Sequence, residues 1–304
     1  NYIGFIESKD MLKGKVDVLV LLSHAGGVAI DEKIAEEVSG IDLIITGHSH
    51  TVTSPPLVTP QTQTLIVDAG EHGYAVGRLD LTIDTHRKGI TSIKGTLKVI
   101  EPAVIAPDPE VFNVIQKVYS EQAPILDEVI GYAPSPLPKE GLESPLGNWQ
   151  ADRIREAAGA DIAFMNREGL HGALPQGDIT VANIYRVTPF YNRIYTFTLS
   201  GREFLDSLEF QVRDNKEPLF VSGIRYTYTK NKANGSRILS SNLLPDKLYQ
   251  IASLNYVCEW SPSILGRPVD FINTGLIFPT IQIDWIRQNK VVRTPEMERF
   301  RQLH

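Results

Sequence analysis

Features that mark several protein classes are scarce or missing in this chain of 304 residues. It has one cysteine, Cys258, so no internal disulfide can support the fold. No apolar run approaches the roughly 20 residues that cross a bilayer as a helix, so we expect no membrane-spanning helix. The net charge is −6, and Lys and Arg do not gather into a cluster, which argues against a polymeric nucleic acid as partner.

The composition fits a folded protein with two cores. Hydrophobic residues make up 42% and charged residues 22% of the chain, which are ordinary values for globular proteins. Residues 102–109 are rich in proline, and apolar residues then recur at a helical period over residues 109–126. We therefore expect one domain over residues 1–100, a linker helix within residues 101–127, and a second domain over residues 128–304.

Two apolar segments of the first domain lead into histidines. Residues 16–22 are followed by His24, and residues 41–46 are followed by His48 and His50. Ligands gather beyond the carboxyl ends of strands in open α/β sheets, and neutral imidazole is a common metal ligand. The pattern makes these three histidines candidate metal ligands.

A single histidine after a strand is more often a hydrogen-bonded turn residue than a ligand. The tetrad Gly47-His48-Ser49-His50 changes that balance. Alternate residues of an extended loop point to opposite sides, so its two histidines can serve two neighbouring ions or clamp one. The sequence therefore predicts a metal centre at His24, His48 and His50.

The segments Ser23-His24-Ala25-Gly26 and Gly47-His48-Ser49-His50-Thr51 resemble the last two metal motifs of the metallophosphoesterase domain in the 5'-nucleotidase family. The resemblance implies two divalent ions (Mn, Zn or Mg) in the parent protein, with His24 and His48 sharing one ion and His50 serving its neighbour. Residues 1–100 would then be the C-terminal part of a four-layer α/β/β/α domain of the calcineurin-like type.

A second segment, residues 143–201, is similar to the C-terminal, substrate-binding domain of the same family. In order, it holds the helix start Ser144-Pro145-Leu146-Gly147-Asn148, a polar turn that begins at Asn166, and the turn Pro189-Phe190-Tyr191-Asn192. Without the resemblance, the first of these motifs indicates only a capped structural helix. The resemblance implies a mixed α/β domain for residues 128–304, so the whole chain would combine α/β and α+β architecture.

The resemblance also implies four substrate-binding residues. Asn166 and His171 stand at the asparagine and arginine positions of a substrate-facing turn, and Phe190 and Tyr256 match two aromatic residues that clamp a base. Histidine is mostly neutral near pH 7, whereas arginine is a permanent cation. The presence of His171, together with Glu168 in place of a glycine, should therefore weaken the recognition of an anion.

Some alternatives stay open at this second site. Arg167 is another cation that can compensate for the missing arginine. Phe190 follows a strand-like segment, residues 179–187, and an aromatic residue beside a proline is more often a packing residue than a ligand contact. The family's Gly-Gly-Asp-Gly turn, which follows the second aromatic residue, does not occur after Tyr256.

The family's earlier motifs, Asp-x-His, Gly-Asp and Gly-Asn-His-Glu, do not occur in this sequence. Residues 2–6 read as a late strand of the catalytic domain, so we expect a fragment that lacks the first part of that domain and holds no catalytic residue of its own. Anionic ligands are needed to keep two dications roughly 3.5 to 4 Å apart. Three neutral imidazoles lack that charge, so we expect at most one weakly bound ion from this chain alone.

Two hypotheses about function follow. The chain is part of a metal-dependent phosphohydrolase of the 5'-nucleotidase type, which hydrolyses nucleotides or related phosphoesters by metal-activated water and is inactive as this fragment. Alternatively, it is a noncatalytic nucleotide- or nucleoside-binding protein with a diverged pocket. Both imply a small-molecule partner, and the resemblance implies a periplasmic, secreted or cell-surface location.

Overall fold

The protein is described by a computed structural model that covers residues 11–12, 14–86, 88–213 and 216–303. The chain forms two compact units, Asn1–Val114 and Ile115–His304. The strand expected at residues 2–6 lies outside the described residues.

A four-stranded sheet forms the centre of the N-terminal unit. Its strand order is β1-β2-β4-β3; β1, β2 and β4 run parallel, and β3 is antiparallel to β4. The strands are β1 (Val20–Ser23), β2 (Leu43–Thr46), β3 (Leu57–Val58) and β4 (Leu65–Val67). Because the three parallel strands end at the same edge of the sheet, the loops that follow them begin side by side.

Helix α2 (Val28–Glu37) connects β1 to β2 and packs on this sheet. Ile34 of the helix forms a buried cluster with Ile44 of β2 and Ile66 of β4. Full burial of an aliphatic side chain contributes about 1.5 to 3 kcal/mol, so this cluster is what holds the helix on the sheet. Leu22 and Ile45 stay 75% and 43% exposed.

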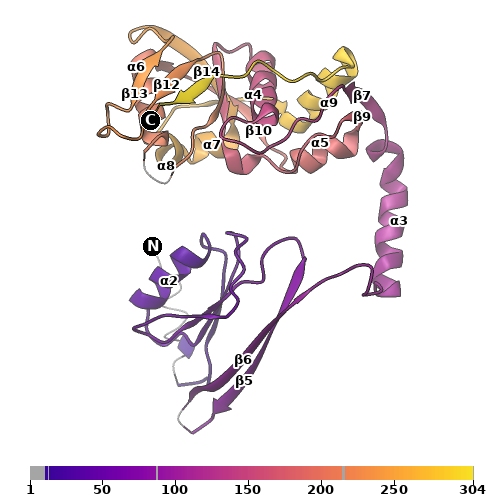
Figure 1. Ribbon diagram of the computed structural model, residues 1–304, viewed down its shortest axis with the longest axis vertical. Coiled ribbons are helices and arrows are strands. Elements are labelled where there is room, and N and C mark those ends of the chain that lie inside the picture. The colour runs from indigo at the N-terminus through magenta and orange to yellow at the C-terminus, as the bar shows by residue number, and fades with distance from the viewer. Residues whose placement is uncertain (1–10, 13, 87, 214–215, 304) are drawn as a thin grey trace. The chain divides into compact units, whose positions relative to one another are not determined.

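A long antiparallel hairpin and helix α3 follow this sheet in the chain and precede the second unit (Figure 1). The hairpin consists of β5 (Ala75–Asp84) and β6 (Gly89–Val99), and none of its described side chains is buried. Helix α3 (Pro109–Leu126) has the bounds that the helical period predicts. It also buries no side chain, and its apolar residues Val114 and Ile125 are 63% and 59% exposed.

The C-terminal unit is built on a mixed five-stranded sheet of order β11-β8-β14-β10-β15. Strands β8 and β14 are parallel, whereas the other neighbouring pairs are antiparallel. Its strands are β8 (Ile162–Met165), β10 (Arg193–Ser200), β11 (Phe220–Ser222), β14 (Leu248–Leu254) and β15 (Ile272–Ile277). Smaller sheets pair β7 (Val129–Ala133) with β9 (Gly177–Thr180), and β12 (Tyr226–Tyr228) with β13 (Ile238–Ser241) and β16 (Phe300–Gln302).

The helices of this unit are α4 (Pro145–Ala158), α5 (Val181–Val187), α6 (Gly201–Gln211), α7 (Asn255–Glu259), α8 (Ser261–Leu265) and α9 (Phe278–Asn289), with the 3₁₀ turn η1 (Arg167–Gly169). Helix α4 begins as the sequence predicts, with Ser144 Oγ accepting a hydrogen bond from Gly147 N at 3.0 Å. Gly147 also allows close packing, because a Cβ atom there would lie 2.4 Å from the ring of Phe220 on β11.

The strand-like reading of residues 179–187 is wrong over most of its length, because only the first two residues belong to β9 and the rest form helix α5. Thr180 and Asn183 form a capping box, in which each side chain satisfies the other residue's backbone N–H. This local cap outweighs the β-branched character of the segment. The predicted combination of α/β and α+β structure is nevertheless confirmed. Among the described residues, no helix has both the length and the apolar composition needed to cross a bilayer.

Candidate functional site

The predicted metal ligands follow strands that are paired in register. Ser23 at the end of β1 pairs with Thr46 at the end of β2, and Ile45 pairs with Val67 at the end of β4. The loop that holds His24 therefore begins next to the loop that holds His48 and His50. The loop after β4 begins at the same edge of the sheet.

The structure brings His24 and His48 together. Nε2 of His24 lies 3.4 Å from Nδ1 of His48, and the two rings meet edge to face with centroids 5.1 Å apart. Two nitrogen ligands at about 2.0 to 2.1 Å from a tetrahedral ion lie about 3.3 to 3.4 Å from each other. The separation of this pair fits two ligands of one divalent ion.

Asp31, in the first turn of α2, fixes the strand ends that precede these histidines. Its buried carboxylate accepts a hydrogen bond of 2.5 Å from Ser23 Oγ and a second one from Thr46 Oγ1. One carboxylate thus joins the ends of β1 and β2. The positions of His24 and His48 relative to each other depend on this link.

Glycine places the His48-His50 loop close to the start of α2. Gly27 has a φ of +90°, and a Cβ atom there would lie 2.3 Å from Ser49 Cβ. His48 and His50 themselves have φ values of 79° and 57°, in the left-handed region that residues other than glycine seldom adopt. Such conformations persist only where the surroundings determine them, and they cluster at functional sites.

His50 contacts a different set of side chains. Its Nδ1 atom forms an ion pair with Glu71 Oε2, and the same carboxylate oxygen lies 3.2 Å from His72 Nε2. The sequence reasoning missed Glu71 and His72. The signal was available, because both follow β4 just as the predicted ligands follow β1 and β2.

The donors at this sheet edge suit divalent metal ions. The described residues supply four imidazoles and one carboxylate, the ligand types of zinc sites. Glu71 provides the anionic oxygen that three histidines lack. The residues present therefore fit the metal that the sequence motifs predict.

In the C-terminal unit, Asn166 and His171 flank the turn η1. Asn166 follows β8, is 6% exposed, and donates from Nδ2 to Glu168 Oε2 at 3.2 Å. His171 is anchored by its backbone N–H, which donates to Val187 O at 3.1 Å. Its ring meets that of Phe190 edge to face, with centroids 5.1 Å apart.

The two predicted aromatic clamp residues are both accessible. Phe190 is 45% exposed and Tyr256, on α7, is 48% exposed. Asn255 Oδ1 accepts a hydrogen bond of 2.9 Å from Arg193 N, which links the start of α7 to the start of β10. Among the aromatic contacts of the described residues, Phe190 pairs with His171 and not with Tyr256.

Comparisons with known proteins show which family the chain belongs to. Residues 129–259 match the family model described as 5'-nucleotidase, C-terminal domain. The crystal structure of a 5'-nucleotidase precursor from Thermus thermophilus superimposes with a TM-score of 0.81 at 26% identity, covering 100% of this chain and 67% of that one. A curated relative is also 32% identical over 80% of this chain, and together these matches show the family. The chain belongs to the 5'-nucleotidase family.

Two curated relatives of this 5'-nucleotidase family member come from Bacillus subtilis (strain 168). The trifunctional nucleotide phosphoesterase protein YfkN is 32% identical over 269 residues, and the endonuclease YhcR is 28% identical over 265 residues. The alignments cover 80% and 82% of this chain but 18% and 21% of the relatives. The chain thus spans about a fifth of each.

Arg167 is the cation that the sequence offered in place of an arginine at position 171, and its side chain is held by a neighbouring loop. Its guanidinium donates to the carbonyl oxygens of Leu142 at 2.8 Å and Gly141 at 2.6 Å, and its Nε lies 2.7 Å from Glu217 Oε2. It also stacks over the ring of Phe220 at 4.5 Å. Arg167 therefore anchors a neighbouring loop, and His171 stands without arginine's permanent charge.

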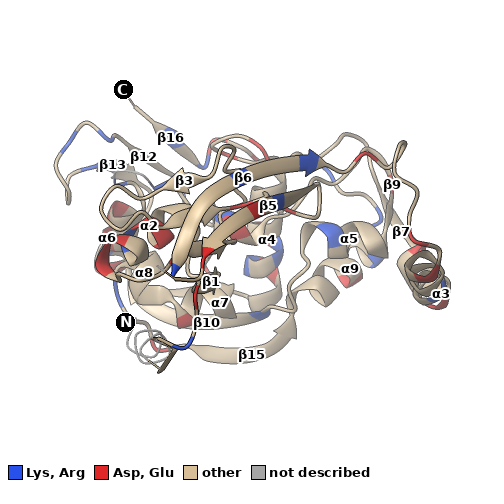
Figure 2. Cartoon of the chain, turned by 90° about the horizontal axis from the view of Figure 1, so that it is seen from below, with Lys and Arg blue, Asp and Glu red and all other residues tan. Residues whose placement is uncertain are grey.

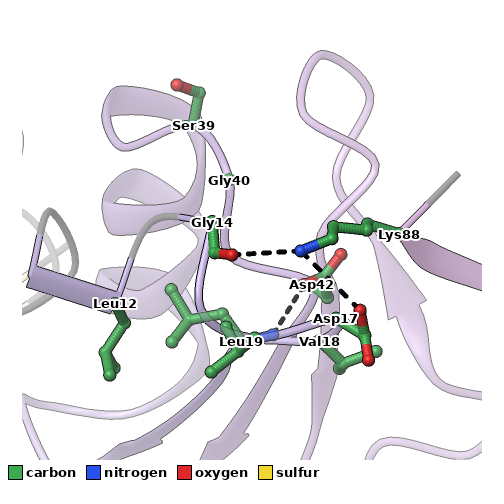
Figure 3. A pocket seen from close by; sticks show the side chains of 10 residues that line it. Leu12, Gly14, Asp17, Val18, Leu19, Ser39, Gly40, Asp42 and Lys88 are labelled. Carbon is green, nitrogen blue, oxygen red and sulfur yellow. Dashed lines mark hydrogen bonds and ion pairs between the residues drawn. The ribbon is translucent and has the colours of Figure 1, made fainter. Parts of the chain in front are cut away.

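A pocket of about 340 Å³ in the N-terminal unit lies away from the histidines (Figure 3). Val18 and Leu19 precede β1 and Asp42 precedes β2, so the pocket is at the amino ends of these strands. Lys88 Nζ donates to Gly14 O at 3.1 Å there. The histidines lie at the opposite edge, after the carboxyl ends of β1 and β2.

Proposed function

We propose that this chain forms part of a metal-dependent phosphohydrolase of the 5'-nucleotidase type, acting on nucleotides or related small phosphoesters. The observation that carries the proposal is the 3.4 Å separation of His24 Nε2 and His48 Nδ1 at the carboxyl ends of two parallel strands. Family membership supplies the chemical context. In this proposal residues 1–100 contribute metal ligands, residues 101–127 link the domains, and residues 128–304 select the substrate.

His24 and His48 would hold one divalent ion, and His50 would serve a second. Bound Mn, Zn or Mg ions would polarise the phosphoryl oxygens and lower the pKa of a water molecule. The chain's own residues position these ligands, because Asp31 joins the ends of β1 and β2.

The C-terminal unit would bind the rest of the substrate. The exposed rings of Phe190 and Tyr256 offer flat surfaces for a base, and stacking of this kind contributes about 1 to 3 kcal/mol per base. Asn166 and His171 lie at either end of the turn η1 and offer hydrogen-bonding groups.

A small substrate is favoured over a nucleic acid polymer. The chain carries a net charge of −6, and Figure 2 shows Lys and Arg interspersed with Asp and Glu along the elements. Binding to a phosphate backbone requires a concentration of cations along one groove. One relative is named as an endonuclease, so a polymer belongs in the test as a separate substrate.

A second candidate function is noncatalytic binding of a nucleoside or nucleotide. The observation that favours it is the altered turn, in which Glu168 lies 3.2 Å from Asn166 Nδ2 and His171 replaces arginine. An added carboxylate and a lost cation disfavour an anionic ligand. This candidate predicts tight nucleoside binding without turnover.

The deciding experiment measures phosphate release by the natural full-length polypeptide with Mn, Zn or Mg. The substrates are nucleotides and simple phosphoesters, with single-stranded DNA followed separately by strand cleavage on a gel. The variant His24→Ala/His48→Ala is compared with His86→Ala, which removes an exposed histidine of the β5-β6 turn. Release that is lost in the double variant and retained in the control supports the proposal. No metal-dependent release from any small phosphoester overturns it. We also propose export from the cytoplasm, which fractionation of the cells tests.

A further inference from the structure

Three side chains from two loops form a second cluster of metal-ligating atoms at the histidine edge. His50 follows β2, and Glu71 and His72 follow β4. One ligand atom from each lies within 4.8 Å of the others. Glu71 Oε2 contacts both imidazoles, at His50 Nδ1 and at His72 Nε2.

The framework beneath this cluster is regular. Strands β2 and β4 are direct neighbours, paired from Leu43 with Leu65 to Ile45 with Val67. His50 and His72 both have left-handed backbone conformations, with φ values of 57° and 54°. The same conformation on both sides of the carboxylate brings the rings to centroids 5.6 Å apart.

The donor set is the one that zinc uses when a coordination position stays open. Two histidines and one glutamate are the protein ligands of several catalytic zinc sites. A single ion pair would occupy Glu71 with one imidazole, whereas here one oxygen contacts two. A dication satisfies both nitrogens and the carboxylate at the same time. The side chains of His50, Glu71 and His72 are 48%, 40% and 56% exposed, so an ion can reach them from solvent.

We propose that His50, Glu71 and His72 form a divalent-metal site within this chain, suited to Zn²⁺ and to its substitute Co²⁺, and distinct from the pair His24-His48. The proposal rests on the proposed function only for the general role of His50 as a metal ligand. It adds two ligands from the loop after β4. It also gives the chain an anionic ligand of its own.

The test is a Co²⁺ titration of this chain, followed by the visible absorption that four- and five-coordinate Co²⁺ shows. The titration is made in a His24→Ala/His48→Ala background, so that only the proposed trio remains. We expect one equivalent of Co²⁺ to bind and Zn²⁺ to displace it. Glu71→Ala and His72→Ala should each weaken Co²⁺ binding by at least about tenfold. Loss of a group that only hydrogen-bonds to a metal ligand already costs about 10- to 100-fold in affinity, and loss of a ligand itself should cost no less. The control His86→Ala should bind as the background does.

Thermal melting followed by circular dichroism tests whether each variant is folded. If Glu71→Ala does not fold, the nearly isosteric variant Glu71→Gln takes its place. Co²⁺ binding that is unchanged by His72→Ala, or absent from the background, overturns the proposal. The result is independent of phosphate release by the full-length polypeptide. A failed hydrolysis assay and a failed Co²⁺ titration therefore identify different errors.

Discussion

The carboxylate of Asp31 accepts a hydrogen bond of 2.5 Å from the hydroxyl of Ser23, the residue directly before His24. Its other oxygen accepts from Thr46, two residues before His48. A buried acidic side chain on α2 therefore sets the spacing between two strand ends. We infer that His24 and His48, the proposed metal ligands, owe their position to this residue.

Asp31→Ala should destabilise the N-terminal unit by about 1 to 3 kcal/mol, because the buried hydroxyl of Thr46 loses its closer acceptor and keeps only Gly47 O at 3.4 Å. Metal binding at His24 and His48 should weaken as well. Urea unfolding and metal titration measure the two effects. Asp80→Ala, an exposed aspartate on β5, is the control, and equal behaviour of the two variants would show that Asp31 has no positioning role.

Gly27→Ala should impair metal binding more than it impairs folding. The new methyl group would lie 2.3 Å from Ser49 and displace the loop that holds His48 and His50. Gly40→Ala is a matched control, because Gly40 has a similar φ of +85° but no atom within 4 Å of a Cβ position. Backbone strain is then common to both variants. A metal affinity that falls equally in the two would place the effect in the strain and not in the clash.

His171→Arg should tighten the binding of a nucleoside monophosphate about tenfold or more. A hydrogen bond to a charged group contributes about 1.5 to 3 kcal/mol, and the family resemblance implies an arginine at this position. Isothermal calorimetry gives the affinity. His86→Arg adds the same charge in the N-terminal unit and should leave binding unchanged. Tightening that also occurs for an uncharged nucleoside would contradict recognition of the phosphate.

Glu128 and Arg287 make stability depend on acid pH. Two hydrogen bonds from Arg287, one at 3.1 Å, lower the pKa of Glu128 below its ordinary value of 4.5. A lowered folded-state pKa stabilises the protein above the unfolded pKa, and this contribution is lost as the pH falls through the folded pKa. Glu128→Gln should thus be less stable than the parent at pH 7, and the difference should vanish as the pH falls below the lowered pKa of Glu128. Urea unfolding at several pH values measures it, and a difference that persists in acid would exclude the ion pair as its cause. Glu121→Gln on α3 is the control.

Cys258 should report the unfolding of the C-terminal unit. Burial raises the pKa of its thiol to about 12, and the side chain is 1% exposed. Because the thiolate is the reactive form, alkylation at pH 8 should be about three orders of magnitude slower in the native protein than in urea. Mass spectrometry after timed exposure to iodoacetamide follows the reaction. Rapid labelling without denaturant would show that this part of the unit opens readily.

The sequence by itself determined which strands precede the histidines and where helices α3 and α4 begin. Those features are local, because apolar runs, a proline at a helix start and a serine cap act over a few neighbouring residues. The motifs also implied that His24 and His48 lie together, and in the structure His24 Nε2 is 3.4 Å from His48 Nδ1. The helical character of residues 181–187 was local too, but its Thr180-Asn183 cap was overlooked.

Only the tertiary structure decided which other side chains lie against the proposed metal ligand His50. Glu71 and His72 reach His50 because β4 pairs with β2, although the two loops lie about 20 residues apart in the chain. The direction of Arg167 was settled in the same way, by carbonyl oxygens of a loop 25 residues earlier. Contacts of this kind depend on strand order and on the packing of distant segments. The hydrophobic periodicity of a sequence predicts helices and strands but not which distant side chains meet.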